Sequence, residues 1–445
     1  MLEELWRVFT FQDYNTRVVM AGTGLLGLAA GVIGVFLVLR KRALLSDAVS
    51  HATLPGVILA FWASIALGMT GRSLPVLLSG AALTGLLGMV TVVALRRWSP
   101  IKDDAALAIV LSVFFGAGIA LFGMVQQIEG VHAAGLTDFI YGKTASMLIS
   151  DTVIIGIAAL GVCGIAIALF KEFRLLCFDE AFAAVQGWPT LRLDLLLMGL
   201  IVLVTVIGLQ AVGLILIVAL LIIPPVTARL WTHRLAPMAA LSGMFGMLGA
   251  GTGSAVSALF ERLPSGALIV LSASAFFFVS LMLGTEGGLL PRLWRRARLR
   301  RRIRRQHLLR RAWELREQTG KRTFSARGLV ARHAWHPVVA ALELRSARRA
   351  GLVQRIDGGR WEFTPAGESE ASRAVRNHRL WELYLITHAD VAPSHVDSDA
   401  DRIEHVLDPD MVAELEELLA REQEDTPPPS PHRLETPTNG GGNGR

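Results

Sequence analysis

Asp47 and His51 stand four residues apart in SDAVSHATLPG, residues 46–56, a stretch whose other side chains are small or apolar. Side chains at positions i and i+4 share one face of a helix, so this spacing predicts a carboxylate beside an imidazole. Such a pair suits Mn²⁺, Fe²⁺ or Zn²⁺, and one pair from each of two subunits would supply four ligands around a two-fold axis. The sequence therefore predicts a metal site that no single chain need complete.

A second interpretation of this pair stays open. Asp47 lies little more than one helical turn beyond the basic cluster Arg40, Lys41 and Arg42, so it could be a helix-start carboxylate at the membrane surface with His51 as its neighbour. The metal interpretation requires the pair to face a bundle interior or a polar pathway, because an ionisable side chain costs a few kcal/mol inside a bilayer.

The elements that must position this pair are membrane spans. The chain has 445 residues, of which 52% are hydrophobic, and apolar blocks long enough to cross a bilayer recur from residue 18 to residue 283. These blocks predict an all-α polytopic membrane bundle of about eight or nine transmembrane helices. The candidate spans are residues 18–39, 43–70, 76–95, 105–126, 151–170, 193–209, 211–229, 238–258 and 266–284.

Three compositional features refine this picture. Basic clusters follow alternate spans, so nine spans with an external N-terminus place every cluster on the cytoplasmic side. The glycine-rich stretches GTGLLGLAAGVIG (22–34) and GMFGMLGAGTG (243–253) allow close helix packing. With Cys163 and Cys177 as the only cysteines, neither a disulfide scaffold nor a thiolate metal cage is expected.

The chain changes character after residue 290, where Arg and Glu become frequent and no apolar run is long enough to span a membrane. We expect a soluble cytoplasmic part that begins with a dense arginine run, which suits anionic lipid headgroups and, as an alternative, nucleic acid. The expected divisions are a transmembrane domain (1–290), a basic juxtamembrane linker (291–305), a winged helix-turn-helix-like domain (306–370), a helical metal-binding or dimerisation-like region (371–424) and a disordered tail (425–445).

Three motifs together resemble the membrane permeases of metal-type ABC importers: KRALLSDAVSHATLPGVILAF (41–61), FDEAFAAVQGW (178–188) and GLQAVGLILIVALLIIPPVTARL (208–230). The resemblance implies Asp47 and His51 as ligands on the translocation path of a divalent metal, which is the substrate, with no permanently bound cofactor. It also implies several partners: a cytoplasmic ABC ATPase, an extracellular or periplasmic metal-binding protein, and a second permease subunit, identical or different.

Residues 178–188 lie between the cytoplasmic ends of two predicted spans. The sequence predicts a short helix that Asp179 caps and Gly187 closes, with Phe178 and Phe182 on its surface. Such a helix can dock in a groove of a partner or lie at the membrane interface, and the resemblance favours docking on the ATPase through these residues and Glu180. The chain has no GxxxxGK[ST] motif, so we expect no ATP hydrolysis by this chain and no enzymatic activity.

The soluble part resembles the diphtheria-toxin-repressor family of metal-dependent regulators in FTPAGE (363–368), RNHRLWELYL (376–385) and DADRIEHVL (399–407). The resemblance implies metal ligation by a larger set of side chains. These are His378, Glu382, Asp401, Glu404 and His405. Helical spacing groups them on two faces, although a solvated acidic helix is the alternative. The pattern departs from the family at Arg310, where an acidic residue is expected.

These features predict the permease subunit of an ATP-driven importer in the bacterial plasma membrane, with a cytoplasmic metal-sensing or regulatory appendage. Manganese is the expected cargo, and iron and zinc stay open because their ligand sets overlap. Two alternatives are a membrane-anchored metal-responsive transcription regulator and an ion-gradient-driven metal carrier. Nucleic acid is not an expected partner, because WHPVVAALELRSARRAGL (335–352) offers mostly apolar side chains where a recognition helix presents polar ones to base edges.

Overall fold

The computed structural model describes residues 13–67, 73–127, 144–260, 263–333 and 336–388. The chain forms two compact units, Met1–Arg292 and Leu293–Arg445, and each is described here by itself.

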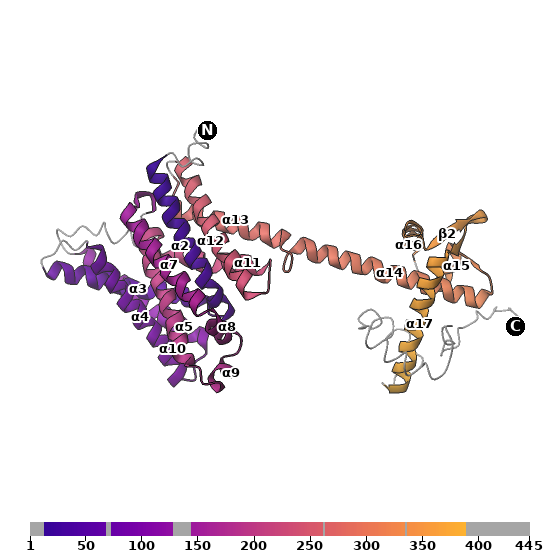
Figure 1. Cartoon of the computed structure of the whole chain (residues 1–445), viewed down its shortest axis with the longest axis horizontal. Coiled ribbons are helices and arrows are strands. Elements are labelled where there is room, and N and C mark those ends of the chain that lie inside the picture. The colour runs from indigo at the N-terminus through magenta and orange to yellow at the C-terminus, as the bar shows by residue number, and fades with distance from the viewer. Residues whose placement is uncertain (1–12, 68–72, 128–143, 261–262, 334–335, 389–445) are drawn as a thin grey trace, which may run out of the picture. The chain divides into compact units, whose positions relative to one another are not determined.

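The first unit is a bundle of apolar helices (Figure 1). Eight of the described helices are long and apolar enough to cross a membrane. They are α2 (Tyr14–Leu39), α3 (Ala43–Ala66), α4 (Leu74–Trp98), α5 (Asp103–Gln126), α7 (Ile149–Ala168), α10 (Thr190–Val212), α12 (Leu235–Leu259) and α13 (Ser265–Leu283). A short 3₁₀ turn, η1 (Thr144–Ser146), precedes α7. The predicted polytopic α-helical bundle is confirmed.

The ninth predicted span is the shorter helix α11 (Leu214–Arg229), which has 16 residues. At 1.5 Å per residue it measures about 24 Å, less than the roughly 30 Å hydrocarbon core of a bilayer. Gly213 separates α10 from α11 and has a φ of +86°, a conformation that glycine adopts without strain. The apolar run at 193–229 therefore forms two helices, and of these α10 is long enough to cross a bilayer whereas α11 is shorter.

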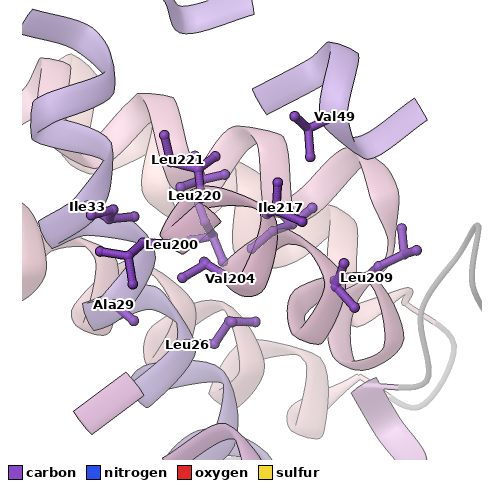
Figure 2. Packing of buried hydrophobic residues seen from close by; sticks show 14 of the residues in the cluster. Leu26, Ala29, Ile33, Val49, Leu200, Val204, Leu209, Ile217, Leu220 and Leu221 are labelled. Carbon is purple, nitrogen blue, oxygen red and sulfur yellow. The ribbon is translucent and has the colours of Figure 1, made fainter. Parts of the chain in front are cut away.

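The centre of the bundle is formed by α2, α10 and α11. Figure 2 shows Ile33 of α2 with Leu200 of α10 and Ile217 and Leu220 of α11 in one buried apolar cluster. In the apolar 18-residue stretch of α2, 72% of the residues are buried. The same share is 22% in α5 and 17% in α13. The outer helices thus leave apolar faces for lipid or for another subunit.

Glycines allow a close helix crossing between α2 and α12. A Cβ atom added at Gly27 would collide with the carbonyl oxygen of Gly246, and one added at Gly246 would collide with that of Gly27. One turn further along α2, the Ser242 hydroxyl donates a hydrogen bond of 2.6 Å to the Gly31 carbonyl. Because lipid is as apolar as the helices, this pair of helices is held together by van der Waals contact between the two backbones.

The basic clusters of the sequence gather at one end of the bundle, here called the basic end. The Arg40 side chain, just after α2, donates a hydrogen bond of 2.8 Å to the Leu176 carbonyl in α8 (Phe170–Phe178). The amide of Gly287, after α13, donates a hydrogen bond of 2.9 Å to the carbonyl of Leu230, which follows α11. Helices α8, and α9 (Glu180–Val185), lie at this end between α7 and α10.

The second unit is a small helical domain with one sheet. Its elements are α14 (Leu289–Thr319), β1 (Thr323–Ser325), α15 (Ala326–His333), α16 (Pro337–Arg349), β2 (Val353–Ile356), β3 (Arg360–Phe363) and α17 (Pro365–His388), with a 3₁₀ turn, η2 (Asp357–Gly359), between β2 and β3. The sheet is antiparallel in the order β1-β3-β2. Leu308, Trp313, Phe324, Leu344 and Phe363 contribute to its core.

Helices α14, α15 and α16 precede the hairpin of β2 and β3, and helix α17 follows it. The winged helix-turn-helix-like domain at 306–370 stays a prediction. Gly358 and Gly359 make the hairpin turn with positive φ angles of 81° and 74°. Two details were not predicted. Strand β1 adds a third strand, and residues 291–305 are not a separate linker but part of the continuous helix α14.

Candidate metal pathway and its basic end

Asp47 and His51 lie side by side on α3, as the helical spacing predicts. The Asp47 Oδ1 atom is 3.4 Å from the His51 Nε2 atom. The Asp47 side chain is 36% exposed and that of His51 is 19% exposed, so the pair lies at a surface of the bundle and not in its sealed core. The His51 ring packs edge-on against Phe115 of α5, with ring centroids 4.7 Å apart. Phe115 was not singled out from the sequence, because only the fold brings α3 and α5 together.

The pair belongs to an exposed stripe along α3. Leu44, Asp47 and His51 follow one another at intervals of three and four residues, and Leu59 and Trp62 lie eight and eleven residues beyond His51 on the same side of the helix. Within the described residues, no group of three or more His, Cys, Asp or Glu side chains could hold a metal ion. The described residues therefore offer one carboxylate and one imidazole here, and a metal bound by this pair would need further ligands from another chain or from water.

The surface-carboxylate interpretation of Asp47 fits the geometry less well. Asp47 is the fifth residue of α3, beyond the first turn, which contains no acidic residue. The basic side chains nearest in sequence bind other carboxylates, since Arg42 contacts Asp194 and Arg40 contacts both Asp194 and Glu180. Asp47 instead contacts His51.

The segment α8–α9 presents an apolar surface at the basic end. The Asp179 carboxylate accepts a hydrogen bond of 2.8 Å from the Phe182 amide and so caps α9, and Gly187 ends the segment with a φ of +84°. Phe178, Phe182 and Val185 are exposed, Val185 to 87%. The predicted cap, closing glycine and exposed aromatic residues are thus present in this structure, and Ala183 anchors the helix by its burial.

An ionic cluster that the sequence analysis missed lies beside this segment. The Arg42 Nη1 atom is 2.8 Å from one Asp194 oxygen and 2.9 Å from the other. The Arg40 Nη2 atom is 3.1 Å from Asp194 and 2.9 Å from Glu180. Burial lowers the pKa of the Arg42 guanidinium and Asp194 opposes this, but Arg42 stays charged because an arginine pKa lies far above neutrality. A carboxylate within the apolar run TLRLDLLLMGL was the signal that could have identified Asp194.

Cys177 lies next to this cluster, where its thiol donates a hydrogen bond of 3.9 Å to the Phe36 carbonyl. Burial raises the pKa of Cys177 to about 12. The thiol is therefore protonated at neutral pH and is neither a nucleophile nor a thiolate ligand in this state.

In the second unit, His378 and Glu382 meet on α17 as predicted. The His378 Nε2 atom is 3.2 Å from the Glu382 Oε1 atom, and both side chains are buried. The Arg310 Nη1 atom lies 2.5 Å from each nitrogen of the His378 ring. A guanidinium thus lies where a metal would approach the imidazole, so these residues form a buried ionic cluster and do not fit an open metal site. Asp401, Glu404 and His405 lie outside the described residues, and their role as ligands stays a prediction.

The eight apolar helices of the described bundle, with an ionisable pair on one exposed helix face and a short helix at the basic end, define a polytopic membrane protein. Comparison with known proteins gives the family. Residues 12–284 match the ABC 3 transport family, and residues 364–438 match the iron dependent repressor, metal binding and dimerisation domain.

Individual relatives agree with this result. The chain is 38% identical over 412 residues to the manganese transport system membrane protein MntC of Bacillus subtilis, covering 92% of this chain and 91% of that one. It is 45% identical over 291 residues to the zinc transport system membrane protein TroC of Treponema pallidum, covering 65% and 95%. A chain in the structure of PsaBC from Streptococcus pneumoniae in complex with Fab superposes with a TM-score of 0.55 at 31% identity, covering 64% and 98%.

The chain belongs to the ABC 3 transport family and is a metal transporter permease of the bacterial plasma membrane. By the positive-inside rule, the arginine and lysine clusters make the basic end of the bundle its cytoplasmic end, and the arginine run after α13 makes the C-terminal part of the chain cytoplasmic. As an ABC permease, the chain implies a separate ATPase and a substrate-binding protein as partners.

Proposed function

We propose that the chain is the permease subunit of a manganese importer, with Asp47 and His51 as ligands on the path of the ion. The observation that carries this proposal is the contact of a carboxylate and an imidazole on the exposed stripe of α3, inside a metal permease of the ABC 3 family. Manganese is favoured because the manganese relative matches 92% of the chain, including the cytoplasmic unit, whereas the zinc relative, although 45% identical, matches 65% of the chain.

The proposed path forms where two permease subunits meet. The exposed stripe of α3 would face the same stripe of a second copy, or the equivalent face of a different permease chain. Two Asp47–His51 pairs would then supply two carboxylates and two imidazoles, a mixed oxygen and nitrogen ligand set that suits Mn²⁺. The metal is cargo, and we propose no permanently bound cofactor.

Metal uptake tests the proposal directly. The chain would be produced with its ATPase and its binding protein in bacteria that lack their own manganese importers, and entry of radioactive manganese would be followed. Unlabelled Mn²⁺ is expected to compete at lower concentration than Zn²⁺ or Fe²⁺. Preferred competition by Zn²⁺ would overturn manganese as the cargo, and absence of uptake of all three metals would overturn the importer.

We also propose that the α8–α9 segment docks on the ATPase through Phe178, Phe182 and Val185. A Val185→Asp variant is expected to weaken retention of the ATPase by about tenfold or more during purification, because it places a charge at the centre of an apolar contact. Val338→Asp is the matched control, since Val338 is also an exposed valine on a short cytoplasmic helix. Equal retention by the two variants would contradict docking at α9.

The cytoplasmic unit is proposed to regulate transport. Its match to a metal-binding and dimerisation domain supports a response to metal, although Arg310 occupies the His378–Glu382 end, so such a response would rest on Asp401, Glu404 and His405. A chain ended after Arg292, the boundary between the units, is expected to retain uptake but to lose the decline in rate that follows manganese loading of the cells. An unchanged decline would show that regulation lies elsewhere.

The two alternative classes receive less support. A membrane-anchored transcription regulator needs base-reading side chains on α16, whose exposed face carries Val338, Val339 and Leu342. An ion-gradient-driven carrier needs no ATPase, and the family of the chain implies one.

A further inference from the structure

We propose that Arg40, Arg42 and Asp194 are positioning residues for transport, which link the ATPase-docking helix α9 to the helix that carries Asp47 and His51. This inference rests on the proposed function, since it assigns a route between two sites that the proposal names.

The first half of the route joins α9 to the turn between α2 and α3. The Arg40 Nη2 atom lies 2.9 Å from Glu180, the first residue of α9, and the Arg40 Nη1 atom donates a hydrogen bond of 2.8 Å to the Leu176 carbonyl of α8. The Glu180 side chain is 52% exposed, whereas that of Arg40 is 6% exposed. One end of this ion pair therefore belongs to the docking segment and the other is fixed inside the bundle.

The second half joins the same turn to α3 and α10. Asp194 accepts hydrogen bonds from Arg42, the residue that immediately precedes α3, and also lies 3.1 Å from Arg40. The three side chains are buried, each with less than a tenth of its surface exposed. Asp47 follows Arg42 by five residues, little more than one turn of the same helix.

The turn itself is short and stiff. Only Lys41 separates the residue after α2 from the residue before α3, and Lys41 has a φ of +57°, a left-handed conformation that a residue with a Cβ atom rarely adopts. The Arg42 amide donates a hydrogen bond of 3.1 Å to the Leu37 carbonyl, which closes the turn. This conformation brings both arginines to one carboxylate, so movement of either arginine displaces the start of α3.

The charges of the side chains on this route make each of them necessary. Two guanidinium groups and two carboxylates balance one another, and removing one member would leave a buried charge uncompensated. The comparable turn between α4 and α5 also has an ion pair, Arg96 with Asp103 at 2.7 Å, but its side chains are 26% and 49% exposed. That pair is more exposed and its carboxylate, Asp103, is not the one that binds Arg40 and Arg42, so replacement of Asp103 provides a matched control.

A double-mutant cycle on Arg40 and Glu180 tests the link. Purified permease, ATPase and binding protein would be placed in vesicles, and manganese uptake per ATP hydrolysed would be measured for Arg40→Gln, Glu180→Gln and the double variant. Each single variant is expected to lower this ratio, by about tenfold for Arg40→Gln, and the double variant is expected to be no lower than Arg40→Gln, because that variant already removes the contact with Glu180. Losses that multiply in the double variant would overturn the proposal, as would a wild-type ratio in either single variant.

Two further measurements separate transmission from folding. Asp103→Asn is expected to retain the wild-type ratio, while Asp194→Asn is expected to lower it as Arg40→Gln does. A purely structural role would reduce the amount of assembled complex but leave uptake per ATP unchanged, and this result would also overturn the proposal. If Arg40→Gln does not accumulate, Arg40→Lys replaces it in the cycle, since a lysine lacks the planar fork that reaches both carboxylates and Leu176. Failure of the proposed function is distinguishable, because wild-type vesicles would then take up no manganese.

Discussion

Replacement of Asp47 with alanine is expected to reduce manganese uptake by about 100-fold, and replacement of His51 with alanine by a similar factor. If the pair binds the ion as proposed, each change removes one of its two ligands, and in a symmetric pair of permeases it removes that ligand twice. The remaining ligands cannot compensate, since the described residues contain no third His, Cys, Asp or Glu close enough to complete a site.

The measurement is the initial rate of manganese entry at matched amounts of protein in the membrane. Asp104→Ala is the control, because Asp104 is an exposed aspartate in the first turn of α5 and contributes to no proposed site. Retained ATPase binding by the Asp47 and His51 variants would show that the loss arises at the path and not at assembly. Wild-type uptake by both variants would contradict the role of the pair.

Replacement of Phe115 is expected to reduce manganese uptake by an intermediate amount. The Phe115 ring packs edge-on against the His51 imidazole. Such aromatic contacts contribute about 1 kcal/mol, far less than loss of a metal ligand, so Phe115→Leu should fall between the wild type and His51→Ala. This order follows from the assignment of His51 as ligand and Phe115 as its support.

The sequence was sufficient for the spans, because a bilayer requires about 20 apolar residues and each block of this kind is visible by itself. It was also sufficient for the contact of Asp47 with His51 and of His378 with Glu382, since both pairs lie within one helix at a spacing of four. The cap of α9 by Asp179 was predicted for the same reason, because cap and helix are neighbours in sequence.

Contacts between distant segments could not be predicted. Asp194 follows Arg42 by 152 residues, and nothing local indicates that two arginines share its carboxylate. Arg310 was recognised as a departure from the expected acidic residue, but only the fold shows its guanidinium against His378. The glycine-rich stretches of α2 and α12 indicated close packing without showing which glycines meet.

The second large effect is expected at that glycine crossing. Replacement of Gly246 with valine should destabilise the bundle by about 3 kcal/mol or more, at or above the upper end of the usual cost of overpacking. The reason is geometric, because the new Cβ atom would meet the carbonyl oxygen of Gly27, and a backbone atom cannot move aside as a flexible side chain can. Even Gly246→Ala should be harmful, since the clash begins at Cβ.

Gly164→Val on α7 is the matched control for this prediction. It introduces the same side chain into another membrane helix, but a Cβ atom at Gly164 meets nothing within 4 Å. Thermal unfolding in detergent should therefore be close to that of the wild type for Gly164→Val and strongly lowered for Gly246→Val. Equal stability of the two variants would show that α2 and α12 can separate without cost, which would contradict the close contact of Gly27 with Gly246.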